Sequence, residues 1–227
     1  MNPQFFGDRH DLFKYDLITC IMKELRNDLS SFTFVPMLTK NRRPTKKSIA
    51  GNDNPELWNC FNEFCGDGAA EDYFKALHDY FAFKGIKLKI FDNRVFSQKN
   101  RREYFDSVRA DLPKNSLIFF DPDTGLKDKN ISEKHLAYSE LRDFFSILDE
   151  RSILMIYQHF YRFRNKHKNF PLAIVEQMRE KTGMKPEYID DNSIMFLFLV
   201  KNPGLQEKLH RALDLYKEKY KESFMKG

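Results

Sequence analysis

Two carboxylates near the middle of the chain follow directly on a run that is expected to be a buried strand. Ser116–Phe120 is almost wholly apolar, and Asp121, Pro122 and Asp123 come immediately after it. A carboxylate there is costly to desolvate unless a cation, a metal ion or a ligand donor is its partner. We therefore expect a functional role for Asp121, with Pro122 and Asp123 beside it as further candidates for the catalytic residues. The alternative is a structural turn or a helix cap at Asp121.

Hydrophobic periodicity predicts the elements that position these residues. Asp8 and Asp11 suit the start of a first helix, Pro36 indicates an edge or a bulge in the first strand, and Asp191-Asn192 marks a hairpin turn. The expected helices are residues 8–26, 55–65, 69–84, 97–112, 139–149, 170–182 and 205–224, and the expected strands are residues 32–38, 86–91, 116–120, 153–157, 187–189 and 194–200.

This alternation of strands and helices predicts an α/β fold. The fold would be Rossmann-like, with a mainly parallel sheet, helices on both faces and a C-terminal antiparallel hairpin. Residues 1–227 are expected to form one domain, with a helix within residues 1–30 and a long basic loop over residues 39–54. In such sheets ligands bind beyond the carboxyl ends of the strands, where Asp92, Asp121 and His159 stand.

The stretch from Ile118 to Leu126, which contains Asp121-Pro122, resembles the fourth motif of S-adenosylmethionine-dependent amino-methyltransferases. In that family a buried strand ends in Asp-Pro-Pro-aromatic, and an acidic or amide side chain and a proline carbonyl accept hydrogen bonds from the target amino group. The resemblance implies these roles for Asp121 and Pro122. Asp123 replaces the second proline, and Thr124 replaces the aromatic residue.

The first helix also resembles the helix that precedes the first strand in many nucleic-acid methyltransferases. This resemblance implies S-adenosylmethionine as cofactor, with Asp92 closing the cofactor pocket at its strand end. The other residues that it assigns to the cofactor side are Asp8, His10, Asp11 and Lys14. Because no glycine follows the first strand until Gly51, a catalytically inactive relative that binds nucleic acid is an alternative.

The paired aspartates also fit a second class of enzyme. Asp121 and Asp123 have the spacing of the Asp-x-Asp motif in haloacid-dehalogenase-like phosphatases, and Asp190-Asp191 resembles their distal acids. A nuclease whose magnesium ion is held by Asp121, Asp123 and either Asp92 or Asp11 needs only clustered oxygen ligands. A magnesium-dependent phosphatase or nuclease is therefore the alternative enzyme.

Two basic segments favour DNA or RNA as partner. Residues 40–47 carry five positive charges and no acid, and residues 161–168 carry four, interleaved with aromatic residues. Cations beside aromatic rings suit a phosphate backbone and stacked bases. Arg42, Arg43, Arg162 and Arg164 are the expected phosphate contacts, and the alternative is a solvated charged face.

Composition narrows the class of protein further. The chain has 227 residues, is 41% hydrophobic and carries a net charge of +5. No apolar run reaches the roughly 18 residues of a membrane span, and three cysteines without a C-x-x-C pair make a disulfide framework improbable. We expect a cytoplasmic protein without a membrane partner.

Overall fold

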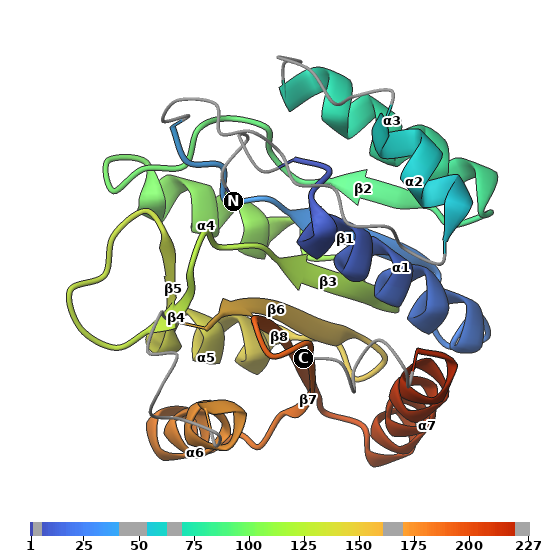
Figure 1. Ribbon diagram of the computed structural model, residues 1–227. Helices are drawn as coiled ribbons and strands as arrows, with labels where there is room; N and C mark the ends of the chain where they lie inside the picture. The colour runs from blue at the N-terminus through green and yellow to red at the C-terminus, as the bar shows by residue number, and fades with distance from the viewer. Residues whose placement is uncertain (2–5, 41–53, 63–69, 161–169, 221–227) are drawn as a thin grey trace.

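The computed structural model describes residues 1, 6–40, 54–62, 70–160 and 170–220. Its main feature is a six-stranded sheet in the order β2-β1-β3-β6-β8-β7 (Figure 1). The strands are β1 (Ser31–Val35), β2 (Leu88–Ile90), β3 (Ser116–Phe120), β6 (Ile153–His159), β7 (Glu187–Asp190) and β8 (Ile194–Val200). Strands β2, β1, β3 and β6 pair in parallel, whereas β8 runs antiparallel to both β6 and β7. The α/β, Rossmann-like prediction and its C-terminal antiparallel hairpin are confirmed.

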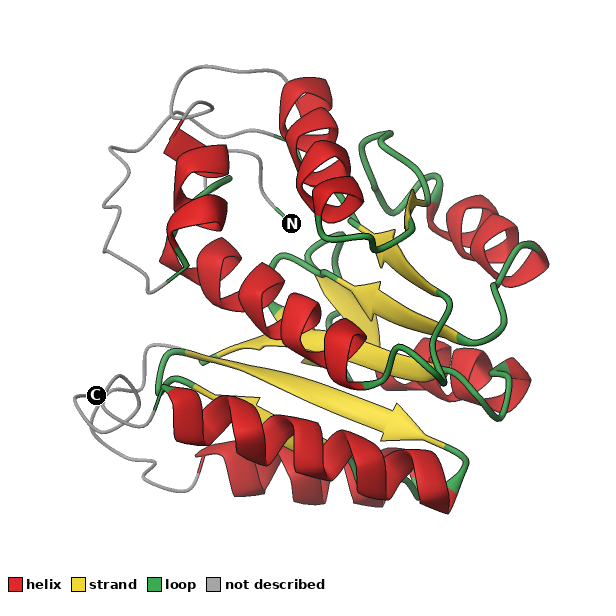
Figure 2. Ribbon diagram, turned by 90° about the vertical axis from the view of Figure 1, so that its right-hand side faces the viewer, coloured by secondary structure: helices red, strands yellow, loops and turns green. Residues whose placement is uncertain are grey.

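Helices cover both faces of the sheet, as Figure 2 shows. They are α1 (Arg9–Glu24), α2 (Pro55–Asn62), α3 (Ala70–Phe83), α4 (Arg101–Ala110), α5 (Tyr138–Ile147), α6 (Phe170–Thr182) and α7 (Pro203–Lys219). Alternate strand residues supply the two cores: Phe119 packs with α1, α3 and α7, and Phe120 packs with α4, α5 and α6. Strands buried on both faces explain the apolar runs of the sequence.

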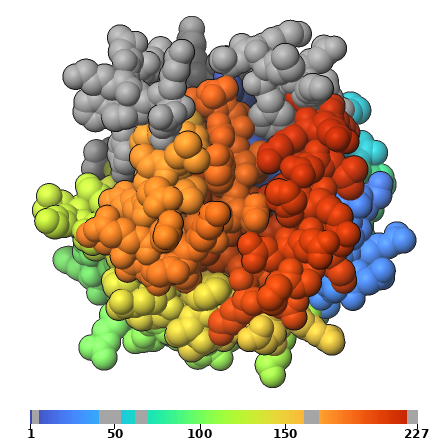
Figure 3. Space-filling view, turned by 90° about the horizontal axis from the view of Figure 1, so that it is seen from below, coloured from blue at the N-terminus to red at the C-terminus, as the bar shows by residue number. Residues whose placement is uncertain are grey.

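The lower edge of the sheet carries α6 and α7. In the view from below, the orange surface around α6 and β7 adjoins the red surface of α7 (Figure 3). Two helices therefore lie near the edge strand β7, one from each face of the sheet. No helix in the described ranges is long and apolar enough to cross a membrane.

The first strand differs from its prediction. β1 lies between β2 and β3, and Pro36 stands one residue beyond its end, so the predicted edge or bulge is wrong. A proline outside the strand removes no ladder hydrogen bond. The structure also contains a small parallel sheet of β4 (Gly125–Lys127) and β5 (His135–Ala137), which the sequence does not predict because three residues are too few for a period.

Candidate functional site

A cavity of about 400 Å³ opens where β3 and β6 end, beside the first turns of α1. It brings together eight residues that the sequence singled out: Asp8, His10, Asp11, Lys14, Asp121, Pro122, Asp123 and His159. The other described residues that line it are Met1, Phe6, Thr124, Lys134 and Tyr157. The cavity thus lies at the carboxyl edge of the sheet, where ligands of open α/β sheets bind.

The N-terminal cap of α1 sets the positions of its first residues. Asp8 is the capping residue, and its carboxylate accepts hydrogen bonds from the backbone N–H groups of His10 and Asp11 at 2.9 and 3.0 Å. Such a cap satisfies donors that the helix itself leaves unpaired. It places His10, Asp11 and Lys14 on the turns of α1 that border the cavity.

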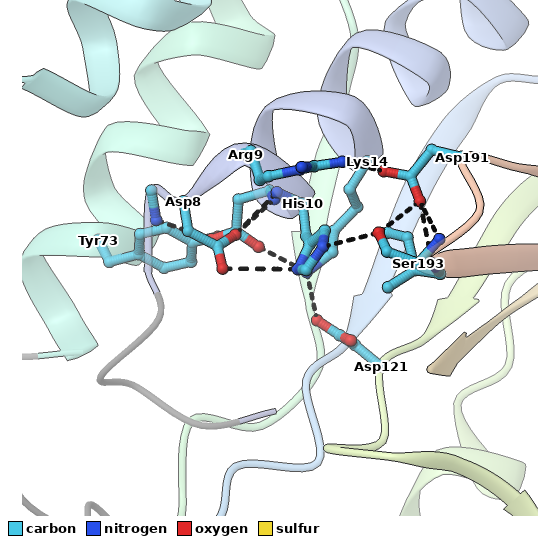
Figure 4. A network of polar contacts seen from close by, with 11 residues as sticks. Asp8, Arg9, His10, Lys14, Tyr73, Asp121, Asp191 and Ser193 are labelled. Atoms are coloured by element: carbon cyan, nitrogen blue, oxygen red, sulfur yellow. Dashed lines mark hydrogen bonds and ion pairs between the residues drawn. The ribbon is translucent and has the colours of Figure 1, made fainter. Parts of the chain in front are cut away.

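Lys14 joins two carboxylates at the centre of the site (Figure 4). Its Nζ lies 2.7 Å from Asp11 Oδ1 and 2.7 Å from Asp121 Oδ2, and all three residues are buried. Burial disfavours the charge on Lys14, but Asp11 and Asp121 outweigh it and hold the pKa of the ammonium well above its usual range. Lys14 therefore stays charged at neutral pH.

Asp11 is held by further donors. The hydroxyl of Tyr73 on α3 donates to Asp11 Oδ2 at 2.7 Å, and the backbone N–H of Gly7 donates to the same oxygen at 2.8 Å. These bonds give the buried carboxylate oxygen the donors that it needs. Sequence reasoning missed Tyr73, because nothing local marks a tyrosine 62 residues away as a partner of Asp11.

The loop after Asp121 is fixed by the end of β6. The side chain of Gln158 accepts a hydrogen bond from Leu126 N at 2.8 Å, and the backbone N–H of His159 donates to Thr124 O at 3.1 Å. Asp123 pairs with Lys134 at 3.1 Å. Lys134 belongs to the loop before β5, and no sequence signal marks it.

The space beyond the carboxyl ends of β1 and β2 is occupied by residues of the chain itself. Met37 is fully buried with φ at 40°, and Phe96 N donates to Leu38 O at 2.6 Å. Asp92 is not among the residues that line the cavity; its carboxylate accepts from Arg94 N at 2.8 Å and pairs with the Arg94 guanidinium. The structure therefore does not bring Asp92 to the other candidate residues.

Two backbone carbonyls at this edge accept hydrogen bonds from the α-amino group of Met1, and burial lowers the pKa of this group to about 6. The α-amino group of Met1 lies 3.0 Å from Met37 O and 3.0 Å from Asp121 O. These acceptors follow β1 and β3, which are neighbours in the sheet. Both carbonyls are therefore already bonded within the chain.

Metal binding finds no support among the described residues. In that part of the chain, no group of three or more His, Cys, Asp or Glu residues is arranged to hold a metal ion. Asp121 and Asp123 lie in the same cavity, but Asp121 bonds to Lys14 and Asp123 to Lys134.

The four arginines expected to contact phosphates lie outside the described residues: Arg42, Arg43, Arg162 and Arg164. The described residues that precede these two segments are Lys40, after β1, and Phe160, after β6. Both segments thus begin from the carboxyl edge of the sheet.

No family model and no curated protein matches this sequence. The function must therefore be inferred from the fold and from the geometry of the cavity.

Proposed function

We propose that the protein transfers a methyl group from S-adenosylmethionine to an amino group bound in this cavity. The proposal depends mainly on Asp121. This residue lines the cavity, and its Oδ2 accepts a hydrogen bond from Lys14 Nζ. No described residue donates to its other oxygen, Oδ1. Oδ1 is not one of the sealed, unpartnered buried atoms of the described residues, so at the wall of the cavity it is open to accept a hydrogen bond, and the N–H of a bound amine would supply the donor.

The fold supports this proposal. The order of strands and helices, the antiparallel hairpin at the end and the Asp121-Pro122 pair at the end of β3 agree with the order that the methyltransferase resemblance implies. Bound cofactor would supply an activated, positively charged methyl donor.

The charges of the cavity also suit a cationic ligand. Four aspartates line it against two lysines, and both lysines are paired with aspartates. Asp92 has no role in binding the cofactor in this proposal, because its carboxylate is bonded to Arg94 and does not line the cavity. Asp121 and the carbonyl of Pro122 would orient the amino group, and Lys14 would keep Asp121 ionised and in place.

A magnesium-dependent phosphatase or nuclease is the second candidate. It is favoured by the presence of Asp121 and Asp123 in one cavity. It ranks second because each carboxylate already bonds to a lysine.

Thermal unfolding with S-adenosylhomocysteine, S-adenosylmethionine or magnesium, each alone, tests the two candidates. A ligand at 100 times its dissociation constant should stabilise the fold by about 2.7 kcal/mol, which raises the midpoint by roughly 5–10 °C. We expect this rise with the two adenosyl compounds. A rise with magnesium alone, or no rise with any of the three, would contradict the methyl transfer.

The Asp121→Asn variant gives the matched comparison. An amide is accepted at this position in the methyltransferase motif, so the variant should still be stabilised by S-adenosylhomocysteine. A magnesium enzyme that uses Asp121 as nucleophile or ligand should lose all activity on the same change.

DNA or RNA is the proposed source of the amino group. If Arg162 and Arg164 contact phosphates, the double variant Arg162→Ala and Arg164→Ala should bind nucleic acid more weakly. Its affinity should also depend less steeply on salt, with a slope smaller by about 2. The measurement is fluorescence anisotropy with a labelled oligonucleotide from 50 to 200 mM salt. An unchanged slope would exclude these two arginines as phosphate contacts.

A further inference from the structure

The hairpin between β7 and β8 reaches the cavity through one histidine. His10 Nε2 lies 3.1 Å from Ser193 Oγ, and Ser193 Oγ lies 2.6 Å from Asp191 Oδ1 (Figure 4). On its other side, His10 Nδ1 lies 3.6 Å from Asp8 Oδ2. Four side chains thus run in a line from the hairpin to the cap of α1: Asp191, Ser193, His10 and Asp8.

The hydrogen-bond inventory decides which nitrogen of His10 carries the proton. An ionised carboxylate can only accept, so the single hydroxyl proton of Ser193 goes to Asp191. The backbone N–H groups of Ser193 and Ile194 donate to the same Asp191 oxygen at 2.9 Å each. Burial raises the pKa of Asp191, but the hydrogen bonds from Ser193 and Ile194 outweigh it and hold this pKa below its usual value.

Ser193 Oγ must then accept from His10, which places the proton on Nε2. The lone pair of Nδ1 is left facing Asp8 at the edge of the cavity. Of the two tautomers of a neutral imidazole, the hydrogen bond at one nitrogen selects which nitrogen stays basic. The hairpin therefore sets the basic atom of His10 from outside the cavity.

We propose that Asp8 and His10 together accept the proton that the methylated amine releases. Ser193 and Asp191 are positioning residues that keep Nδ1 of His10 unprotonated. This inference rests on the proposed methyl transfer.

When the amine nitrogen forms its bond to the methyl carbon, the bond from that carbon to the sulfonium sulfur would break and its electron pair would stay on sulfur, so the nitrogen is left with one proton too many and a positive charge. Nδ1 of His10 takes that proton, the N–H electron pair stays on the amine nitrogen, and His10 becomes an imidazolium between Asp8 and Ser193. Loss of the proton to water then restores the neutral imidazole.

The surroundings of His10 suit this cycle. Burial lowers the pKa of His10, so the ring is neutral at pH 7 and able to accept. Burial raises the pKa of Asp8 to about 7, although the hydrogen bonds that its carboxylate accepts from the backbone lower this pKa. The charged and titratable groups around the ring are Asp8, Arg9, Asp11 and Lys14 at the start of α1, Asp191 on the hairpin and His159 at the end of β6.

Nitrogen-15 NMR of the histidine rings tests the positioning role without any need for activity. In the full chain, His10 is assigned by the signals lost in His10→Gln, and we expect its proton on Nε2. In Ser193→Ala, Nε2 loses its acceptor, so the tautomers should mix. The pKa of His10 should also fall, because the hydroxyl stabilises the imidazolium more than the neutral ring.

Two further variants serve as controls. Ser193→Thr restores a hydroxyl and should restore the Nε2 tautomer. Ser146→Ala removes a hydroxyl that donates only to Asp143 O on α5, far from the site, and should leave His10 unchanged. A proton on Nδ1 in the wild type, or a His10 tautomer that Ser193→Ala does not alter, would overturn the inference.

The rate of methyl transfer as a function of pH provides the second readout. The wild-type rate should rise with pH through about 7, as Asp8 ionises beside a neutral His10. The Ser193→Ala plateau should be lower by about tenfold, with substrate affinity retained. If S-adenosylhomocysteine fails to bind while the tautomer shift occurs, methyl transfer and the proton-acceptor role both fall. If it binds and the shift is absent, only the inference falls.

Discussion

Replacing Lys14 with methionine is expected to lower the free energy of unfolding by about 3–5 kcal/mol at pH 7, the usual cost of removing one partner from a buried ion pair. Methionine can keep the contacts with the rings of Tyr15, Phe119 and Tyr157 around the lysine. It cannot replace the charge that lies 2.7 Å from Asp11 and from Asp121. Two carboxylates would then share a buried site without their cation.

The pH dependence separates this effect from lost packing. Burial raises the pKa of Asp121, and Lys14 opposes that rise. Without Lys14 the pKa of Asp121 rises further, so the folded variant takes up a proton at a higher pH than the unfolded chain does. A carboxyl whose folded pKa is raised gains stability as pH falls. The deficit of the variant should therefore be smaller at pH 5 than at pH 8, as measured by urea unfolding at each pH.

A surface pair provides the matched control for Lys14. Lys181 lies 3.2 Å from Asp128, and both side chains are about one third exposed. Lys181→Met should cost less than about 1 kcal/mol and show little of this pH dependence. Adding Asp121→Asn to Lys14→Met should recover part of the loss. Equal losses of unfolding free energy in Lys14→Met and Lys181→Met would show that Lys14, Asp11 and Asp121 do not form a buried, charged cluster.

The fold was predictable where apolar residues form an unbroken run or recur at helical spacing. Residues 116–120, 170–182 and 194–200 were predicted with the bounds that β3, α6 and β8 have in the structure. Burial on both faces gives β3 and β8 their continuous apolar runs. The short β4 and β5 have no period of their own. Their bonds to the rest of the protein come from residues distant in sequence: Arg101 donates to Ser132 O and His135 O, and Gln158 accepts from Leu126 N.

The site was predictable in so far as its signals are local. The cap of α1 and the motif at Asp121 can be recognised from neighbouring residues, and the structure brings both to one cavity. Tyr73 and Ser193 could not be found in this way, because each meets its partner only after the chain has folded. Asp92 is a local signal that misleads. Its carboxylate accepts a hydrogen bond from the backbone N–H of Arg94, two residues on, and this local turn competes with any role in ligand binding at the strand end.

The Gly125→Ala variant is expected to disturb the loop that carries Asp123 and to lower the free energy of unfolding by about 3–5 kcal/mol. Gly125 has φ at 115°, and a Cβ there would lie 2.4 Å from Gln158 Oε1 and 2.5 Å from its Cδ. Gln158 cannot simply move aside, since it is fully buried and its amide bonds Leu126 N and His159 O.

Gly85→Ala separates the overlap from the backbone strain. Gly85 also has a positive φ, 69°, but a Cβ there would meet nothing within 4 Å, so its replacement should cost only about 1–2 kcal/mol. Removing the obstructing side chain as well gives the second comparison: Gly125→Ala combined with Gln158→Ala should lose less than the sum of the two single variants. Urea unfolding of the four proteins measures this coupling. Additive losses, or equal losses for Gly125→Ala and Gly85→Ala, would mean that Gln158 does not lie against Gly125, and that the loop after Asp121 is held in some other way.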